Sequence, residues 1–319
     1  MTLFPTKTSR EGEPTASRAS HDARPVPATP ARHRLALPWA AIVAMAGLSL
    51  LPACQPAQPI VPDDLRPAPI ATQSVPDYGD LVRAYNANAA AVDRVYVRTG
   101  VAMRWRDENG KARRESGDGR LIFRRPLDTA LTVEVLGDVK LWAGGDETAF
   151  WLFDLYDTKT AFHGDVARPL ARPLPLPVRP EAVPWLLGLM PLDPDRRPAK
   201  PEVELVNGYA LIEPPGLNLR MLLHPETGRP QRVDLIAPDG GSFLRCVLSG
   251  ELEVPPSSAT GSGAVLPAKA DIYPEHEESR LTVDLKSSVD PKKIRGTWFR
   301  FEDLRRALRP KAVESLNEP

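Results

Sequence analysis

The clearest structural pattern in the chain is the stretch Val95-Tyr96-Val97-Arg98-Thr99-Gly100-Val101-Ala102-Met103-Arg104-Trp105-Arg106. Its side chains alternate between an apolar face, which carries Val97, Val101 and Trp105, and a second face rich in arginine. Alternation with a period of two is typical of an antiparallel strand with one buried and one solvated face. Asp107-Glu108-Asn109-Gly110 follows, and Asn-Gly favours the positive φ angles of a hairpin turn. We therefore expect the chain to turn back here and to continue an antiparallel sheet.

Short strands joined by tight turns continue along most of the chain. The first meander adds strands that end at Leu121-Ile122-Phe123, contain Leu131, Val133 and Val135, and span 139–143 and 148–156. After an insertion at 167–201, the predicted strands span 202–206, 209–213, 217–223, 231–237, 242–251, 268–273 and 280–286. We therefore predict an α+β fold, a curved antiparallel half-barrel sheet of roughly eleven strands that a few helices cover.

Three predicted helices supply this cover. Asp77 can cap a helix that runs to about Val92, because its apolar residues recur at intervals of three and four. Inside the Pro-rich insertion, a short helix that begins near Pro180 is apolar nearly all round, so it must be buried or bind something apolar. A last helix spans Phe301 to Leu308.

The N-terminal part carries an apolar run from Leu35 to Leu51, which Arg32-His33-Arg34 precedes and Pro52-Ala53-Cys54 follows. A basic flank, an apolar run, a small residue and a cysteine form a pattern that resembles a bacterial lipoprotein signal with its lipobox. The resemblance implies that Cys54 is lipidated and becomes the mature N-terminus. An uncleaved signal anchor with an incidental cysteine is the alternative, although the run is short for a membrane span.

These segments divide the chain into three parts. Residues 1–53 are expected to be a signal peptide with a long disordered n-region, whose length a misassigned start codon would also explain. Residues 54–76 form a Pro-rich tether, and 77–319 form a single domain with the insertion 167–201. The mature protein is then lipid-anchored in the cell envelope and faces the periplasm. In enterobacteria-like sorting, Asp after the lipidated cysteine marks inner-membrane retention, so Gln55 favours the outer membrane.

Composition and cysteine usage narrow the function classes. Lys+Arg and Asp+Glu both total 41, so there is no net charge to recruit nucleic acid or acidic lipid. Besides Cys54, the only cysteine is Cys246, on the Leu side of an alternating strand. We interpret Cys246 as a small buried hydrophobe rather than a reactive thiol.

Catalytic and metal-binding motifs are not found in the sequence. There is no G-x-S-x-G, Walker-type loop, C-x-x-C or H-E-x-x-H, and His163, His224 and His276 lie far apart. The stretch 274–278 offers metal-seeking groups, but a solvated acidic loop is the simpler interpretation. We therefore predict a non-enzymatic protein without a metal or cofactor, and keep an enzyme of unrecognised type as an alternative.

Aromatic residues gather in the first meander and the insertion. They include Trp142, Phe150, Trp151, Phe153 and Trp185, which form either an ordinary core or the wall of a ligand cavity. The strand 148–156 is apolar on both faces and therefore needs two covers. In a half barrel, one cover can be a helix and the other a ligand or a partner.

The order of elements resembles the outer-membrane lipoprotein carriers and receptors of the LolA/LolB-like superfamily. The segments that carry the resemblance are 81–105, 121–156, 180–192 and 217–248. The resemblance implies an unclosed barrel whose apolar cavity holds acyl chains and passes them on without covalent chemistry. The lipobox is similar to that of the acylated receptor type, while the Pro-rich insertion and the C-terminal strand pair depart from the smaller family members.

From this resemblance we expect a membrane-anchored protein that binds a lipid or lipoprotein acyl chain, with a lipoprotein-sorting protein as a possible partner and no nucleic acid. The cavity is predicted to be lined by Val97, Val101, Met103, Trp105, Leu131, Val133, Val135, Phe150 and Leu152. Its lid is predicted to be Trp185, Leu186 and Leu189. The alternative is a structural or scaffold lipoprotein whose sheet is filled by its own side chains.

Overall fold

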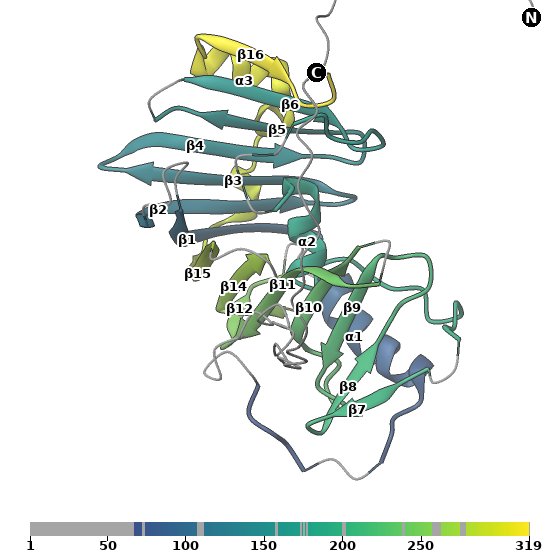
Figure 1. The fold of residues 1–319 in the computed structure, drawn as a ribbon. Helices are drawn as coiled ribbons and strands as arrows, with labels where there is room; N and C mark the ends of the chain where they lie inside the picture. Colours follow the sequence, from purple (N-terminus) through teal and green to yellow (C-terminus); the bar gives the residue numbers. More distant parts are fainter. Residues whose placement is uncertain are drawn as a thin grey trace, which may run out of the picture. The chain divides into compact units, whose positions relative to one another are not determined.

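A sheet of fourteen strands dominates the computed structural model (Figure 1). Its first half contains β1 (Arg94–Arg106), β2 (Ala112–Arg124), β3 (Asp128–Val135), β4 (Asp138–Gly145), β5 (Ala149–Asp154) and β6 (Thr160–Asp165). Its second half contains β7 (Glu204–Val206), β8 (Tyr209–Ile212), β9 (Leu219–Leu223), β10 (Pro230–Ile236), β11 (Ser242–Ser249), β14 (Lys269–Pro274) and β15 (Arg280–Ser288). Antiparallel pairing of β1 with β15 joins the two halves.

The sheet is open at both ends. The short strand β16 (Ala312–Ser315) pairs in parallel with β6 at one edge, and β7 forms the other edge. A separate hairpin of β12 (Leu252–Val254) and β13 (Ala264–Leu266) packs its apolar residues into the main core. The predicted fold class, a curved antiparallel half-barrel sheet with few helices, is confirmed. The described strands outnumber the predicted ones because β6, β12, β13 and β16 are short and lack clear alternation.

The structure describes residues 67–71, 74–106, 112–156, 159–172, 174, 176, 178–199, 202–237, 240–256, 263–274 and 279–318, and not the side chains of Trp105, Arg106 and Arg113. All of them belong to one compact unit, Gln55–Pro319. The predicted signal, Cys54, Gln55, the hairpin turn 107–110 and His276 lie outside the described residues. No helix within the described ranges is long and apolar enough to span a membrane.

Helix α1 (Tyr78–Ala90) packs on the inner face of the sheet, which we define as the face that carries Val97 and Val101. Asp77 caps the helix, as predicted, because its side chain accepts a hydrogen bond from the Asp80 backbone N–H. Asn86 and Asn88 are poor helix formers, but each exchanges two hydrogen bonds with distant backbone, at Leu192 and Val265 respectively. The two asparagines therefore join α1 to the insertion and to β13.

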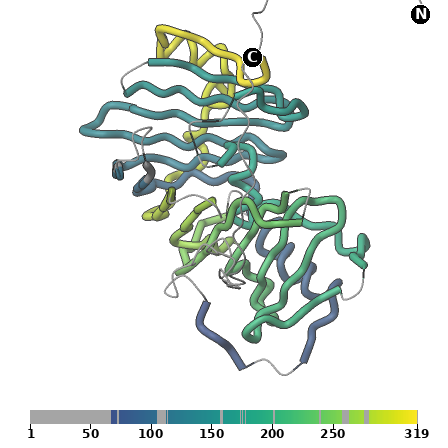
Figure 2. The backbone as a smooth tube through the Cα atoms, in the orientation of Figure 1, coloured from purple at the N-terminus to yellow at the C-terminus, as the bar shows by residue number. Residues whose placement is uncertain are grey.

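The C-terminal segment covers the outer face of the first half (Figure 2). It contains η3 (Pro291–Lys293), η4 (Gly296–Phe299) and α3 (Phe301–Leu308), the last with the predicted bounds. Phe299 packs with Tyr96 and Ile122, and Leu304 packs with Trp151 and Phe153. Both apolar faces of β5 are therefore covered by the chain itself. On the outer face this cover is helix α3, in line with the expectation that one of the two covers is a helix.

Two hairpin turns share one backbone conformation but differ in sequence. Asn207-Gly208 has φ angles of 53° and 84°, and Leu136-Gly137 has φ angles of 52° and 86°. Positive φ at both positions favours Asn-Gly and is costly for a residue such as leucine. The Leu136 side chain is also fully exposed, so no packing offsets this cost.

We therefore predict that Leu136→Asn raises the free energy of unfolding by about 0.5–1 kcal/mol. Urea unfolding followed by circular dichroism measures the change. The reciprocal variant Asn207→Leu is the control and is expected to lower stability by a similar amount. Loss of stability in Leu136→Asn would contradict the assignment of strain to this turn.

Candidate functional site

The inner face of the first half contains a small apolar cavity. Strands β1, β3, β4 and β15 supply one wall, and the segment 176–183 of the insertion supplies the other. The lining residues are Val101, Met103, Thr129, Leu131, Val133, Leu141, Ala143, Leu176, Val178, Pro180, Val183 and Leu281. The space open to the centre of a water molecule is about 20 Å³. A cavity of this size holds no more than about one water molecule, so the site is closed in this conformation.

The wall opposite the sheet is built from a segment with little regular secondary structure, which we name the cover (174–183). Only its end is helical, as η2 (Pro180–Ala182), which leads into α2 (Val183–Leu186). Proline has no backbone N–H, so a Pro-rich segment can lie over an apolar surface with few donors left to satisfy. The cover therefore rests on side-chain burial rather than on a backbone hydrogen-bond ladder.

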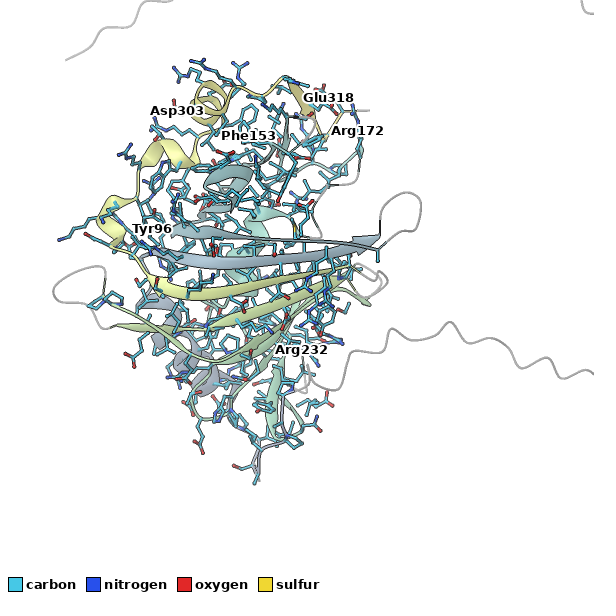
Figure 3. The ribbon with its side chains drawn as sticks, turned by 90° about the vertical axis from the view of Figure 1, so that its left-hand side faces the viewer. Tyr96, Phe153, Arg172, Arg232, Asp303 and Glu318 are labelled. Carbon is cyan, nitrogen blue, oxygen red and sulfur yellow. The ribbon has the colours of Figure 1, made fainter. Side chains whose placement is uncertain are left out.

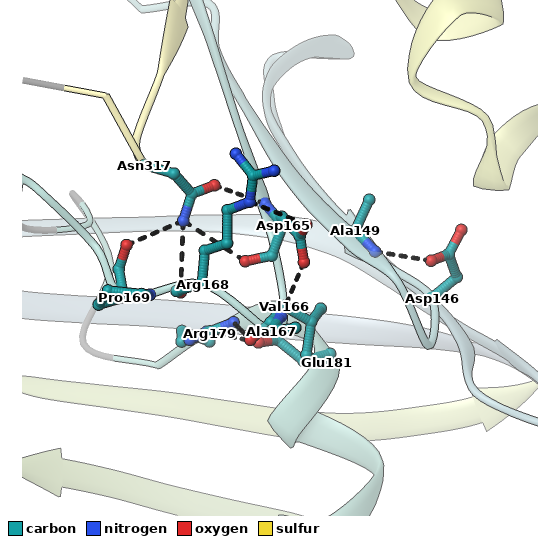
Figure 4. Close-up of polar contacts among 10 residues, drawn as sticks. All are labelled: Asp146, Ala149, Asp165, Val166, Ala167, Arg168, Pro169, Arg179, Glu181 and Asn317. Carbon is teal, nitrogen blue, oxygen red and sulfur yellow. Dashed lines mark hydrogen bonds and ion pairs between the residues drawn. The ribbon is translucent and has the colours of Figure 1, made fainter.

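An ion pair lies at the end of the cover (Figure 4). The Arg179 guanidinium contacts the Glu181 carboxylate, lies 4.7 Å from the centre of the Phe150 ring, and donates a hydrogen bond to the Val166 carbonyl. Glu181 is buried, and one of its carboxylate oxygens has no hydrogen-bond partner among the described residues. Burial raises the pKa of Glu181, and Arg179 opposes that shift only in part.

Asn317 fixes the beginning of the insertion (Figure 4). Its side-chain oxygen accepts a hydrogen bond from the Asp165 N–H, and its amide donates to the carbonyls of Asp165, Arg168 and Pro169. Arg125 holds the other end, because its guanidinium donates to the Leu189 carbonyl and to Ala89 and Val92 at the end of α1. Polar contacts thus hold the chain on both sides of the cover, at 165–169 and at Leu189, and the cover between them packs apolar residues onto the sheet.

The structure brings some of the predicted cavity residues together. Val101, Met103, Leu131 and Val133 line the cavity. Val97 and Leu152 belong to the same buried core without lining the cavity, and Phe150 lies under Arg179. Val135 is half-buried near the end of β3, and the side chain of Trp105 is not described.

The predicted lid lies beside the cavity rather than over it. Leu186 and Leu189 are fully buried in the core, and Trp185 is partly buried against that core. The residues that close the cavity are Leu176, Val178, Pro180 and Val183, which sequence reasoning missed. Their signal was the alternation of leucine, valine and proline at 174–178, which has the period of a strand but places proline, which has no backbone N–H, between the apolar residues.

The remaining candidate groups do not form a reaction centre within the described residues. Cys246 is a free, buried cysteine, as predicted, and burial raises the pKa of its thiol. His163 packs against Phe301, and His224 packs against Tyr209. In the part of the chain that the structure describes, no three His, Cys, Asp or Glu residues are placed to hold a metal ion.

Three solved structures are similar to this chain. A DUF1329 family protein from Desulfovibrio piger is 12% identical, with a TM-score of 0.48 over 71% of this chain and 97% of its own. A LolA superfamily protein from Nitrosomonas europaea is 9% identical, with a TM-score of 0.46 over 70% of this chain and 97% of its own. An outer-membrane lipoprotein-sorting domain from Vibrio parahaemolyticus is 9% identical, with a TM-score of 0.48 over 73% of this chain and 99% of its own.

No family model and no curated protein matches the sequence. At such low identities and TM-scores, the likeness to the three structures assigns neither a family nor a function to this chain. The function must therefore be inferred from the residues of the cavity and its cover.

We predict that the buried Glu181 makes the protein less stable as the pH rises. Its pKa is raised above the ordinary value of 4.5, so the folded state binds more protons than the unfolded state in the range between the two values. Stability from this group is present below pH 4.5 and is lost as the pH rises through the folded pKa. Glu181→Gln is expected to lose less stability than the wild type between acidic and neutral pH.

Urea unfolding of both proteins across this pH range tests the prediction. The exposed Glu204→Gln, on β7, is the matched control and should follow the wild-type curve. Parallel curves for the wild type and Glu181→Gln would show that burial of this carboxylate does not affect stability.

Proposed function

We propose that this protein binds the acyl chain of a lipid or lipoprotein on the inner face of β1, β3 and β4, without converting it chemically. The observation that supports this proposal most is an apolar cavity whose outer wall has no regular secondary structure at Leu176 and Val178, and only short helical turns at Pro180 and Val183. Such a wall can move away without breaking a strand ladder or a long helix. The inner face would then offer Val101, Leu131 and Val133 to a hydrocarbon chain.

The size of the cover sets a minimum length for the ligand. The cover contributes four apolar side chains to the cavity wall, those of Leu176, Val178, Pro180 and Val183. Burial of one such side chain is worth roughly 2 kcal/mol, so the four together are worth about 8 kcal/mol. Since a buried methylene contributes about 0.8 kcal/mol, an acyl chain must bury about ten methylenes to replace the cover. Long acyl chains therefore bind and short ones do not.

The proposal also includes the cellular localisation of the protein. The lipobox-like sequence before Cys54 supports lipidation of Cys54, and the Pro-rich residues that follow support a tether. The protein then faces the periplasm from a lipid anchor, with the outer membrane favoured over the inner. Its sorting partner would be a protein that delivers or accepts the same acyl chain. Reception or transfer proceeds by partition between two apolar environments, which requires no cofactor.

A scaffold function is the second candidate, and one observation favours it. Side chains of the chain itself already fill the inner face, and the residual space is only about 20 Å³. In that case the cover is a permanent part of the core. The two candidates differ in what happens when the cover is weakened.

We predict that the compact unit Gln55–Pro319 binds palmitate and not octanoate, and that Leu176→Ser binds palmitate about tenfold more tightly. The serine removes apolar burial that the ligand must otherwise displace, and about 1.4 kcal/mol corresponds to a factor of ten. Native mass spectrometry with added fatty acid measures both results. A scaffold would lose stability in Leu176→Ser and gain no affinity.

A matched pair of variants controls for the effect of overpacking. Ala143 lines the cavity on β4, whereas Ala270 is buried on the same face of the second half, on β14. Ala143→Val and Ala270→Val are each expected to cost about 1–3 kcal/mol of stability. Only Ala143→Val should weaken palmitate binding, and equal weakening in both would move the ligand site elsewhere.

The anchor is tested on the full chain in bacterial cells that are fed labelled palmitate. We expect the wild type to be labelled and Cys54→Ala to be unlabelled, because lipidation requires the thiol. Cys246→Ala is the matched control and should keep its label, since the Cys246 thiol is buried. An unlabelled wild-type protein would remove the lipid anchor from the proposal.

A further inference from the structure

Three arginines lie side by side on the outer face of the sheet, the face opposite the cavity. Arg104 on β1 is directly opposite Arg280 on β15 and directly opposite Arg114 on β2. We name these three residues the arginine row. Arg104 and Arg114 are exposed, and Arg280 is half-buried. Neighbouring strands lie about 4.8 Å apart, so the row places three positive groups within about 10 Å.

This arrangement is costly unless an anion lies against it. Like charges directly opposite each other on neighbouring strands destabilise a sheet. Other arginines of β1 and β2 are balanced, since Arg124 contacts Asp128, and Arg120 lies 2.7 Å from the Glu134 carboxylate. Among the described residues, no carboxylate pairs with Arg104 or Arg114. Arg104 and Arg114 therefore keep their guanidinium groups free to bind a partner, whereas Arg280 is paired with Asp271.

Cations also exceed carboxylates on the neighbouring strands of this face. Asp234 lies between Arg232 and Arg245, at 3.2 and 3.0 Å. Figure 3 shows Arg232 on the lower strands of the sheet. In the same way, Asp271 lies between Lys269 and Arg280, at 3.2 and 2.7 Å. Each of these buried carboxylates contacts two cations, and the exposed Asp284 lies directly opposite Lys269.

An exposed aromatic side chain lies at the rim of the same surface. Phe243 on β11 is 46% exposed, and it lies near the edge of the sheet where β14 ends and β15 begins at Arg280. The C-terminal segment covers this face only at the other end of β1, around Tyr96. The described residues thus leave the unpaired Arg104 and Arg114 on an open part of the sheet face, with an apolar side chain at its edge.

We propose that this outer face docks on an anionic lipid bilayer, with Arg104 and Arg114 bound to lipid phosphates. A guanidinium group binds phosphate through two parallel hydrogen bonds, and a basic side chain near an anionic surface contributes about fivefold to binding. The exposed Phe243 favours a bilayer over a small anion, because its ring can enter the headgroup region. The net charge of zero predicts no attraction to acidic lipid for the molecule as a whole. It does not describe the outer face alone, because it sums the charges of both faces.

Co-sedimentation with lipid vesicles tests the proposal on the unit Gln55–Pro319, which contains the whole described core. The probes are vesicles of phosphatidylcholine alone and vesicles that contain about one third phosphatidylglycerol. We expect binding to the anionic vesicles only, with most of it lost in about 0.5 M salt. The double variant R104E/R114E should bind at least about 25-fold more weakly, and R104Q/R114Q should show a smaller loss in the same direction.

The matched control is R309E/K311E, which changes the net charge equally on exposed residues between α3 and β16. It should bind anionic vesicles like the wild type, and thermal melting should show that all variants fold.

Equal binding to neutral and anionic vesicles, or equal binding by R104E/R114E and the wild type, would overturn the proposal. Binding to soluble polyglutamate without binding to vesicles would also overturn it, in favour of an acidic protein partner. Palmitate binding should be unchanged in R104E/R114E. Failure of the membrane-docking proposal can therefore be distinguished from failure of the proposed acyl-chain site.

Discussion

An open sheet with two apolar faces must have both faces covered, and most of the other features of this fold follow from that requirement. A closed barrel hides its interior by its own curvature, but this sheet ends at β16 on one side and at β7 on the other. Helix α1 covers the inner face of the second half, and the Pro-rich cover lies over that of the first half. The C-terminal segment covers the outer face of β1 to β5. The polar contacts of Asn86, Arg125 and Asn317 hold these covers in place.

The cover and the C-terminal segment meet the same requirement by different means. Helix α3 satisfies its backbone within itself and presents Phe301 and Leu304 to the sheet. The described residues of the cover instead pack apolar side chains against the sheet, with only one helical turn at Pro180–Ala182. Arg179 fixes the position of the cover, because it lies over the Phe150 ring of β5 and donates a hydrogen bond to the Val166 carbonyl.

Local patterns in the sequence predicted the elements well. The alternation at 95–106, the Asn207-Gly208 turn and the Asp77 cap depend on neighbours within a few residues, and the fold class followed from them. The site depends on residues far apart in the sequence, such as Asn317 and Asp165, which share a hydrogen bond, or Leu176 and Val133, which line the same cavity. No local period reveals such pairs. The lid was therefore placed on the most apolar helix, at 185–190, although topology puts 176–183 over the cavity.

The long sequence separation between strands β1 to β6 and the outer cover has a consequence for biogenesis. Trp151 and Phe153 are among the largest fully buried side chains, and their outer cover is the helix around Leu304. During synthesis or export, strands β1 to β6 emerge long before residues 291–318 do. A long sequence separation between contacting segments slows folding, and exposed apolar sheet faces aggregate. The nascent protein would thus depend on a chaperone until residues 291–308 have emerged, and deletion of those residues would be as damaging as the loss of a central strand.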